Sequence, residues 1–187
     1  MHTHSDYVTA LSCLRDPHIL PIHQSSMRFV ERVAYYQEYD VPDVIDEGKK
    51  LGEALKDKDI LIMGQHGKEL KLPITPVFLL YITVVEAEPR SVLQIITFHS
   101  YLGVLVVAPT VHQAFDEIYY LERACKIQLL ASMAVGGNKE KLSLMTDPNL
   151  YKSVTSSYTN EVIDTYSKRH FYSYWDMYLR NEPDVFS

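Results

Sequence analysis

Apolar residues along this chain occur in two patterns, short continuous runs and helically spaced positions, which predicts strands interleaved with helices. The continuous runs at 59–63 (DILIM) and 104–107 (VLVV) are typical of buried strands. The stretch 32–36 (RVAYY) suits another strand, and residues 2–5 have the character of a strand end. Strands that alternate with helices predict a layered α/β fold.

Helically spaced apolar positions lie between and after these strands. A long helix is predicted to begin at Thr110, whose hydroxyl can cap it, and to end at the Gly136–Gly137 pair. A shorter helix follows residues 2–5, with Ser5 or Asp6 as its N-cap. Besides the long helix, the predicted helical stretches cover residues 7–14, 25–29 (a single turn), 44–55 and 149–179.

Length, charge and cysteine content narrow the protein class. We expect a single domain over residues 1–187, because this length is enough to bury a core. The formal net charge of −6 argues against nucleic-acid binding through phosphate contacts. Cys13 and Cys125 lie in apolar helical patterns, which predicts buried free thiols in a reducing compartment.

Neither a targeting segment nor a membrane span is expected. The chain starts with a polar, histidine-rich stretch, which does not fit a signal peptide. The longest apolar run, 77–85 (VFLLYITVV), is too short to cross a bilayer as a helix. A cytoplasmic location follows by default.

Histidines carry the candidate chemistry. His2 and His4 are separated by one residue, so their imidazoles lie on the same side of an extended strand. Another histidine, His66, follows the buried strand 59–63 in a Gln-His-Gly turn. Three histidines with an open position form the layout of a catalytic zinc or of a similar divalent ion.

Four segments together resemble the class II aldolase/adducin superfamily. They are HTHSDYVTALSCL (2–14), DILIMGQHG (59–67), VLVVAPTVHQAFDEIYYLERACKIQ (104–128) and HFYSYWDMYLRNEPDVFS (170–187). The histidine pair alone is a weak signal, but the ordered set of segments is specific. The resemblance covers nearly the whole chain outside residues 68–102.

The resemblance implies a three-layer α/β/α fold and a divalent metal, usually Zn2+, held by His2, His4 and His66. In sugar-phosphate aldolases of this family the metal acts as a Lewis acid on the substrate carbonyl. The implied activity is that of a carbon–carbon lyase, or a related epimerase or decarboxylase, on a small hydroxy-carbonyl or sugar-phosphate substrate. A homo-oligomer, commonly a tetramer, is implied as well.

The start of the chain departs from the family pattern. A carboxylate upstream of the histidine strand usually moves the proton, and loops further upstream usually bind phosphate. Met1 directly precedes His2, so these parts have no counterpart in the sequence. We therefore expect a fold that is incomplete at the N-terminus and a metal triad without its acid/base partner.

The segment 68–102 is the second departure. In the family the His-Gly turn runs directly into the next strand, and merging Gly67 with Gly103 restores that pattern as DILIMGQHGVLVVAPTV. Codons for both ends of the segment can form splice signals, so one hypothesis is a translated intron; the other is a genuine insertion. If translated, its apolar run is expected to lower solubility.

Several site residues keep alternative interpretations. His2 and His4 can be solvated N-terminal histidines, His66 can be a turn residue, and His99 competes as third ligand. Glu122 either orients a ligand or is a paired or surface glutamate. The remaining histidines lack ligand spacing and are interpreted as surface residues or as neighbours of the site, namely His18, His23, His112 and His170.

A non-enzymatic function is the main alternative. The head domains of adducins have a related fold, generally lack the full histidine triad, and belong to actin–spectrin cytoskeletons. Adducins continue into a neck and a basic tail, whereas this chain ends in the acidic stretch 182–187 (EPDVFS). The sequence favours the enzyme, while an inactive product of a mis-spliced gene is a third possibility. The implied site of three histidines suits zinc, manganese, iron or cobalt, and several small carbonyl substrates.

Overall fold

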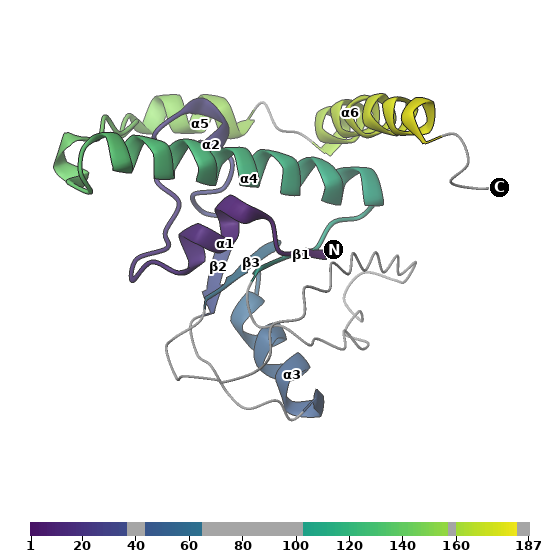
Figure 1. The fold of residues 1–187 in the computed structure, drawn as a ribbon, viewed down its shortest axis with the longest axis horizontal. Helices are drawn as coiled ribbons and strands as arrows, with labels where there is room; N and C mark the ends of the chain where they lie inside the picture. The colour runs from purple at the N-terminus through teal and green to yellow at the C-terminus, as the bar shows by residue number, and fades with distance from the viewer. Residues whose placement is uncertain (37–43, 65–102, 157–159, 183–187) are drawn as a thin grey trace.

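The computed structural model describes residues 1–36, 44–64, 103–156 and 160–182. They form a mixed α/β fold, drawn as a ribbon in Figure 1. Its elements are β1 (His2–Thr3), α1 (Asp6–Ser12), α2 (Gln24–Met27), β2 (Val33–Tyr36), α3 (Val44–Leu55), β3 (Ile60–Met63), β4 (Gly103–Val106), α4 (Val111–Ala134), a 3-10 turn (Lys139–Lys141), α5 (Pro148–Ser156) and α6 (Asn160–Asn181).

The described strands form one mixed sheet in the order β1-β4-β3-β2. β2 and β3 are parallel, while β4 is antiparallel to both β3 and β1. The β3–β4 register places Met63 opposite Gly103, and the β1–β4 register places His2 opposite Leu105. The sheet thus brings the predicted histidine strand beside the strand that begins at Gly103.

Helices cover both faces of this sheet. Ile60 and Ile62 of β3 pack into one hydrophobic cluster with α1 and α4. Leu61 and Met63 point to the other face, where they pack against Leu51 of α3, because side chains alternate along a strand. Figure 1 shows α3 on the side of the sheet opposite α1 and α4. The predicted three-layer α/β/α arrangement is confirmed.

Helix α4 is the longest of the described elements and packs with α1 on one face of the sheet. Thr110 caps it as predicted, with its hydroxyl accepting a hydrogen bond from the Gln113 amide at 3.4 Å. At the other end Gly136 and Gly137 adopt positive φ angles of 62° and 78°, which favour glycine. Leu121 and Cys125 are fully buried on its inner face. Both predicted ends of this helix are therefore correct.

The C-terminal region differs from its prediction. One helical stretch was expected over 149–179, but α5 ends at Ser156 and α6 begins at Asn160. The residues that close α5 offer polar side chains to the backbone: Thr155 donates to the Tyr151 carbonyl and Ser156 to the Ser153 carbonyl. Such side chains compete with the helical hydrogen bonds. The structure thus describes two helices, α5 and α6, where a single stretch was predicted, and residues 157–159 lie outside the described ranges.

The cysteine prediction is correct for one residue only. Cys125 is fully buried, and burial raises the pKa of its thiol far above its ordinary value. Cys13 is exposed, because it is the C-cap of α1 and lies beyond the last buried turn of that helix. Val107 is also half exposed, so the buried part of the fourth strand stops at Val106. Within the described ranges, no helix has the length and apolar character to span a bilayer.

Candidate metal centre

The histidine pair lies at the edge of the sheet. His2 is buried on β1, and the backbone of Met1 exchanges hydrogen bonds of 2.7 and 2.8 Å with that of Val106. The imidazoles of His2 and His4 stack, with ring centroids 4.8 Å apart. The two nitrogen-bearing rings thus lie together on one side of the strand, as their spacing predicts.

Gly103 of β4 lies directly beside the His2 and His4 side chains. Its φ of +139° is one that residues with side chains rarely adopt. A Cβ at this position would lie 2.5 Å from the Thr3 carbonyl oxygen, 3.0 Å from His2 Nε2 and 3.4 Å from His4 Nδ1. Because Gly103 has no side chain, a small space, here called the cradle, remains beside both imidazoles. The sequence alone did not identify Gly103 as a neighbour of the two histidines.

Both histidines are held in the form that binds metals. The pKa of His2 is lowered to about 4, mainly by burial and to a smaller extent by the neighbouring His4 and the N-terminal ammonium. Burial also lowers the pKa of His4. Each imidazole is therefore neutral at pH 7, and a neutral imidazole nitrogen is a good ligand for zinc and related ions.

The third predicted ligand, His66, and its competitor His99 lie outside the described residues. In the part of the chain that is described, no cluster of three His, Cys, Asp or Glu side chains is suited to a metal. The hypothesis about residues 68–102 likewise falls outside these ranges. The donor chemistry of His2 and His4 and the cradle at Gly103 nevertheless fit a divalent ion.

Glu122 of α4 holds the helix that follows the histidine strand. Its Oε1 accepts a hydrogen bond from the Tyr7 amide and its Oε2 one from the Val8 amide, both at 2.9 Å. Ser5 is the N-cap of α1, but its hydroxyl makes no capping hydrogen bond. Of the two interpretations of Glu122, pairing is thus observed, and the partners are backbone amides of α1.

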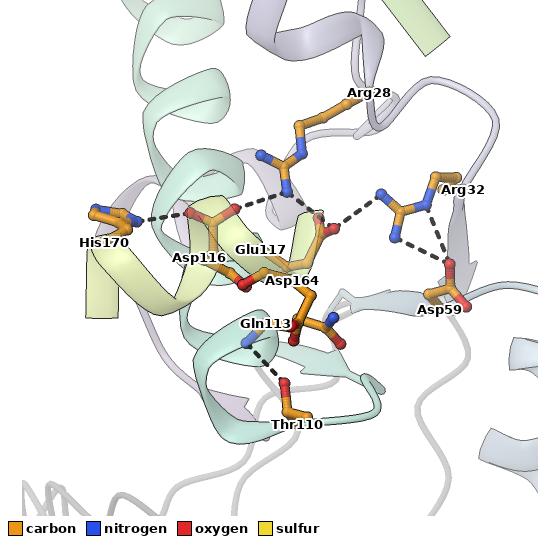
Figure 2. Close-up of polar contacts among 10 residues, drawn as sticks. Arg28, Arg32, Asp59, Thr110, Gln113, Asp116, Glu117, Asp164 and His170 are labelled. Atoms are coloured by element: carbon orange, nitrogen blue, oxygen red, sulfur yellow. Dashed lines mark hydrogen bonds and ion pairs between the residues drawn. The ribbon is translucent and has the colours of Figure 1, made fainter. Parts of the chain in front are cut away.

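A buried charge network lies elsewhere along α4 (Figure 2). Arg28 Nη2, just after α2, is 3.1 Å from Asp116 Oδ2 and 3.0 Å from Glu117 Oε1. All three side chains are almost fully buried. Burial by itself would lower the pKa of Arg28, but Glu117 and Asp116 together raise it. The Arg28 guanidinium neutralises two buried carboxylates, a role that no local sequence pattern predicts.

The network extends to three further elements (Figure 2). Arg32 donates to Glu117 at 3.0 Å and to Asp59, just before β3, at 3.0 and 3.1 Å. His170 Nδ1 of α6 lies 2.7 Å from Asp116 Oδ1. A second histidine, His112, joins α4 to α6 through Asp164 at 2.9 Å. His112 and His170 therefore connect helices in this structure.

Comparisons with known proteins agree with this architecture. Residues 1–68 match the family described as Class II Aldolase and Adducin N-terminal domain. None of the curated proteins compared with the chain matches it significantly.

Two solved structures have a similar fold. An aldolase II superfamily protein from Pseudomonas syringae aligns with a TM-score of 0.64 at 23% identity, over 97% of this chain and 56% of its own. The L-fuculose 1-phosphate aldolase from Glaciozyma antarctica PI12 aligns with a TM-score of 0.61 at 18% identity, over 97% and 52%. The chain spans about half the length of the structures that it matches. The predicted resemblance to the class II aldolase/adducin superfamily is thus confirmed in sequence over residues 1–68, and the two solved structures confirm the predicted fold over nearly the whole chain.

Proposed function

We propose that this chain carries the metal centre of a class II aldolase-like lyase. The observation that supports this most directly is the cradle at Gly103, which faces two stacked, neutral imidazoles on β1. Its proposed ligands are His2, His4 and His66, and the ion is Zn2+ or another divalent metal, because three imidazoles suit several of them. When bound, such an ion supplies Lewis-acid polarisation of a carbonyl or hydroxyl oxygen.

The protein residues supply the binding and the orientation. His2 and His4 are neutral at pH 7, so neither has to lose a proton before it donates a nitrogen lone pair. Gly103 keeps the space beside both rings clear of side-chain atoms. The substrate that we propose is a small hydroxy-carbonyl compound or sugar phosphate, and the similar fold of an L-fuculose 1-phosphate aldolase supports this class. We further propose a homo-oligomer in the cytoplasm.

Metal binding is the first test. The purified protein is stripped with a chelator, and zinc binding is measured by calorimetry in the parent and in His2→Ala, His4→Ala and His66→Ala variants. His18→Ala is the matched control, since His18 is exposed and pairs with Asp16. We expect one ion per chain, with the parent affinity retained only in the control. Equal zinc binding by parent and His4→Ala would contradict the proposal.

Activity is tested separately on the metal-loaded protein. Cleavage of ketose 1-phosphates is followed through release of dihydroxyacetone phosphate in a coupled assay. Because we expect a metal triad without its acid/base partner, the expected result is a slow rate that depends on added divalent ion and disappears in His4→Ala. A metal-loaded protein that cleaves no such substrate would confine the function to metal binding.

A further inference from the structure

We infer that Glu122 is a positioning residue for the histidine pair, acting through the first turn of α1. This inference rests on the proposed metal centre. The carboxylate lies on α4, more than a hundred residues away in sequence, and contacts the backbone just after His4. Nothing in the local sequence of β1 or α1 replaces that contact.

The two amides that Glu122 binds are those that a helix leaves without internal partners. Tyr7 and Val8 are the second and third residues of α1, and their N–H groups are normally capped by the side chain of the N-cap residue. Ser5 occupies the N-cap position with an extended backbone, yet its hydroxyl makes no such bond. Glu122 therefore supplies the cap from another element, and both of its oxygens are used.

A cap from another element also fixes where the helix lies. α4 is anchored in the core on both sides of Glu122, since Leu121 and Cys125 are fully buried. One turn further along, the Lys126 ammonium lies over the Tyr7 ring, 5.1 Å from its centroid. Both contacts join the same face of α4 to the start of α1. The first turn of α1 is thus tied to a rigid support.

The histidine strand depends on this support because it is short. β1 contains two residues and is hydrogen-bonded only to β4 among the described strands. His2 lies within the pairing with β4, whereas His4 lies outside it. Along the chain, two residues separate His4 from Tyr7 and three separate it from Val8. The position of the first turn of α1 therefore sets the position of His4, and with it the geometry of the pair.

The experiment compares zinc affinity with the mobility of the clamped amides. Glu122→Gln retains one acceptor oxygen but turns an amide N–H₂ toward a backbone donor. Glu140→Gln is the matched control, because Glu140 is an exposed carboxylate on the 3-10 turn. We expect about tenfold weaker zinc binding in Glu122→Gln, the range seen for residues that orient ligands. Hydrogen exchange at the Tyr7 and Val8 amides of the metal-free protein should be faster, and the control should match the parent in both.

A second variant separates positioning from simple helix capping. Ser5→Asp combined with Glu122→Ala places a cap on α1 itself while removing the tie to α4. If Glu122 positions His4 through α4, this protein should regain slow amide exchange but still bind zinc about tenfold more weakly than the parent. Full recovery of zinc affinity would show that a cap alone suffices and would overturn the inference.

The remaining outcomes separate this inference from the proposed function. A folded Glu122→Gln protein with parental zinc affinity overturns the positioning role and leaves the metal centre intact. A parent protein that binds no divalent ion overturns the metal centre, and the positioning role falls with it. In that second case, faster exchange at Tyr7 and Val8 in Glu122→Gln would still identify the contact as a structural clamp.

Discussion

The histidine pair on β1 and the Arg28 network on α4 are both polar regions, but they are built in opposite ways. His2 and His4 are neutral, adjacent in sequence and held at a sheet edge. Arg28, Asp116 and Glu117 are charged and almost fully buried, and Arg28 lies 88 residues before Asp116 in the sequence. The first arrangement places two stacked imidazoles beside the space left by Gly103, whereas the second places charged groups of opposite sign in contact.

This difference suggests separate roles, metal binding for the histidine pair and structural stabilisation for the Arg28 network. Buried charges are retained when they are paired, and removing one partner leaves the other without compensation. In the proposed metal site, His2 and His4 would be ligands whose orientation depends on contacts from outside β1, namely those of Gly103 and Glu122. Changes in the two regions should therefore affect different measurements, stability for the network and metal affinity for the histidines.

Arg28→Met should have the largest effect on stability. It removes one of two partners from each buried carboxylate, because Glu117 keeps Arg32 and Asp116 keeps His170. The expected cost therefore lies at the lower end of the about 3–5 kcal/mol that loss of a sole partner causes. Urea unfolding at pH 7 measures the change, and Arg15→Met at an exposed position should change it by less than about 0.5 kcal/mol. The variant that remains folded should keep the zinc affinity of the parent. An unfolding free energy within 1 kcal/mol of the parent, on the order of a surface change, would show that the network is dispensable.

Gly103→Ala should act on the other region. Its positive φ costs a residue with a side chain about 1–3 kcal/mol, and the new Cβ would meet the Thr3 carbonyl at 2.5 Å. The displaced strand should weaken zinc binding by about tenfold or more. Gly137→Ala is the control, because Gly137 also has a positive φ but a Cβ there would meet open space. Similar zinc affinities in the two variants would argue against a cradle at Gly103.

Local pattern was enough to predict most elements on this scaffold. The helix over 44–55 and the cap at Thr110 agree with the structure, because apolar spacing and capping side chains act within a few residues. The stacked pair of His2 and His4 was likewise readable from a two-residue spacing.

The contacts of Arg28 and Glu122 were not readable from local pattern. Arg28 meets its carboxylates, and Glu122 meets the amides of α1, only after the sheet has brought distant segments together. No spacing rule connects such residues, and no other signal in the sequence marked Gly103 as a neighbour of the histidines. The sequence therefore predicted the histidine pair but not the contacts that surround it, and the ligand role of His2, His4 and His66 stays a prediction.

Removal of residues 68–102, with Gly67 and Gly103 replaced by one glycine, tests how β3 and β4 are joined. The register places Met63 opposite Gly103, so merging Gly67 with Gly103 would leave only Gly64, Gln65 and His66 between the paired residues. Hairpin connections of three residues are common, and the shorter loop lowers the closure entropy by on the order of 2 kcal/mol.

We expect the shortened protein to give a higher soluble yield, a higher melting temperature and more bound zinc than the full chain. When the shortened protein also carries His66→Ala, the gain in bound zinc should be lost, while the gains in soluble yield and melting temperature should be kept. Equal yield and equal zinc content in the full and shortened chains would refute the hypothesis that 68–102 is foreign to this fold.

The exposed pair of Asp16 and Lys139 is the counterpart of the buried network and should contribute least. Asp16 accepts hydrogen bonds from Lys139 and His18, and these bonds lower the pKa of Asp16 from 3.8 to about 2. Both partners are about half exposed, so solvent screening limits the contribution to less than about 1 kcal/mol.

The sign of its pH dependence follows from the lowered pKa. The stabilisation by Asp16 is fully present above its ordinary pKa of 3.8 and is lost as the pH falls toward 2. Asp16→Asn should therefore lower the melting temperature slightly at pH 7, by an amount that shrinks below pH 3.8. Glu140→Gln, on the same 3-10 turn as Lys139, should show no such trend. A loss at pH 7 as large as that of Arg28→Met would mean that pairing, rather than burial, determines the importance of charge in this protein.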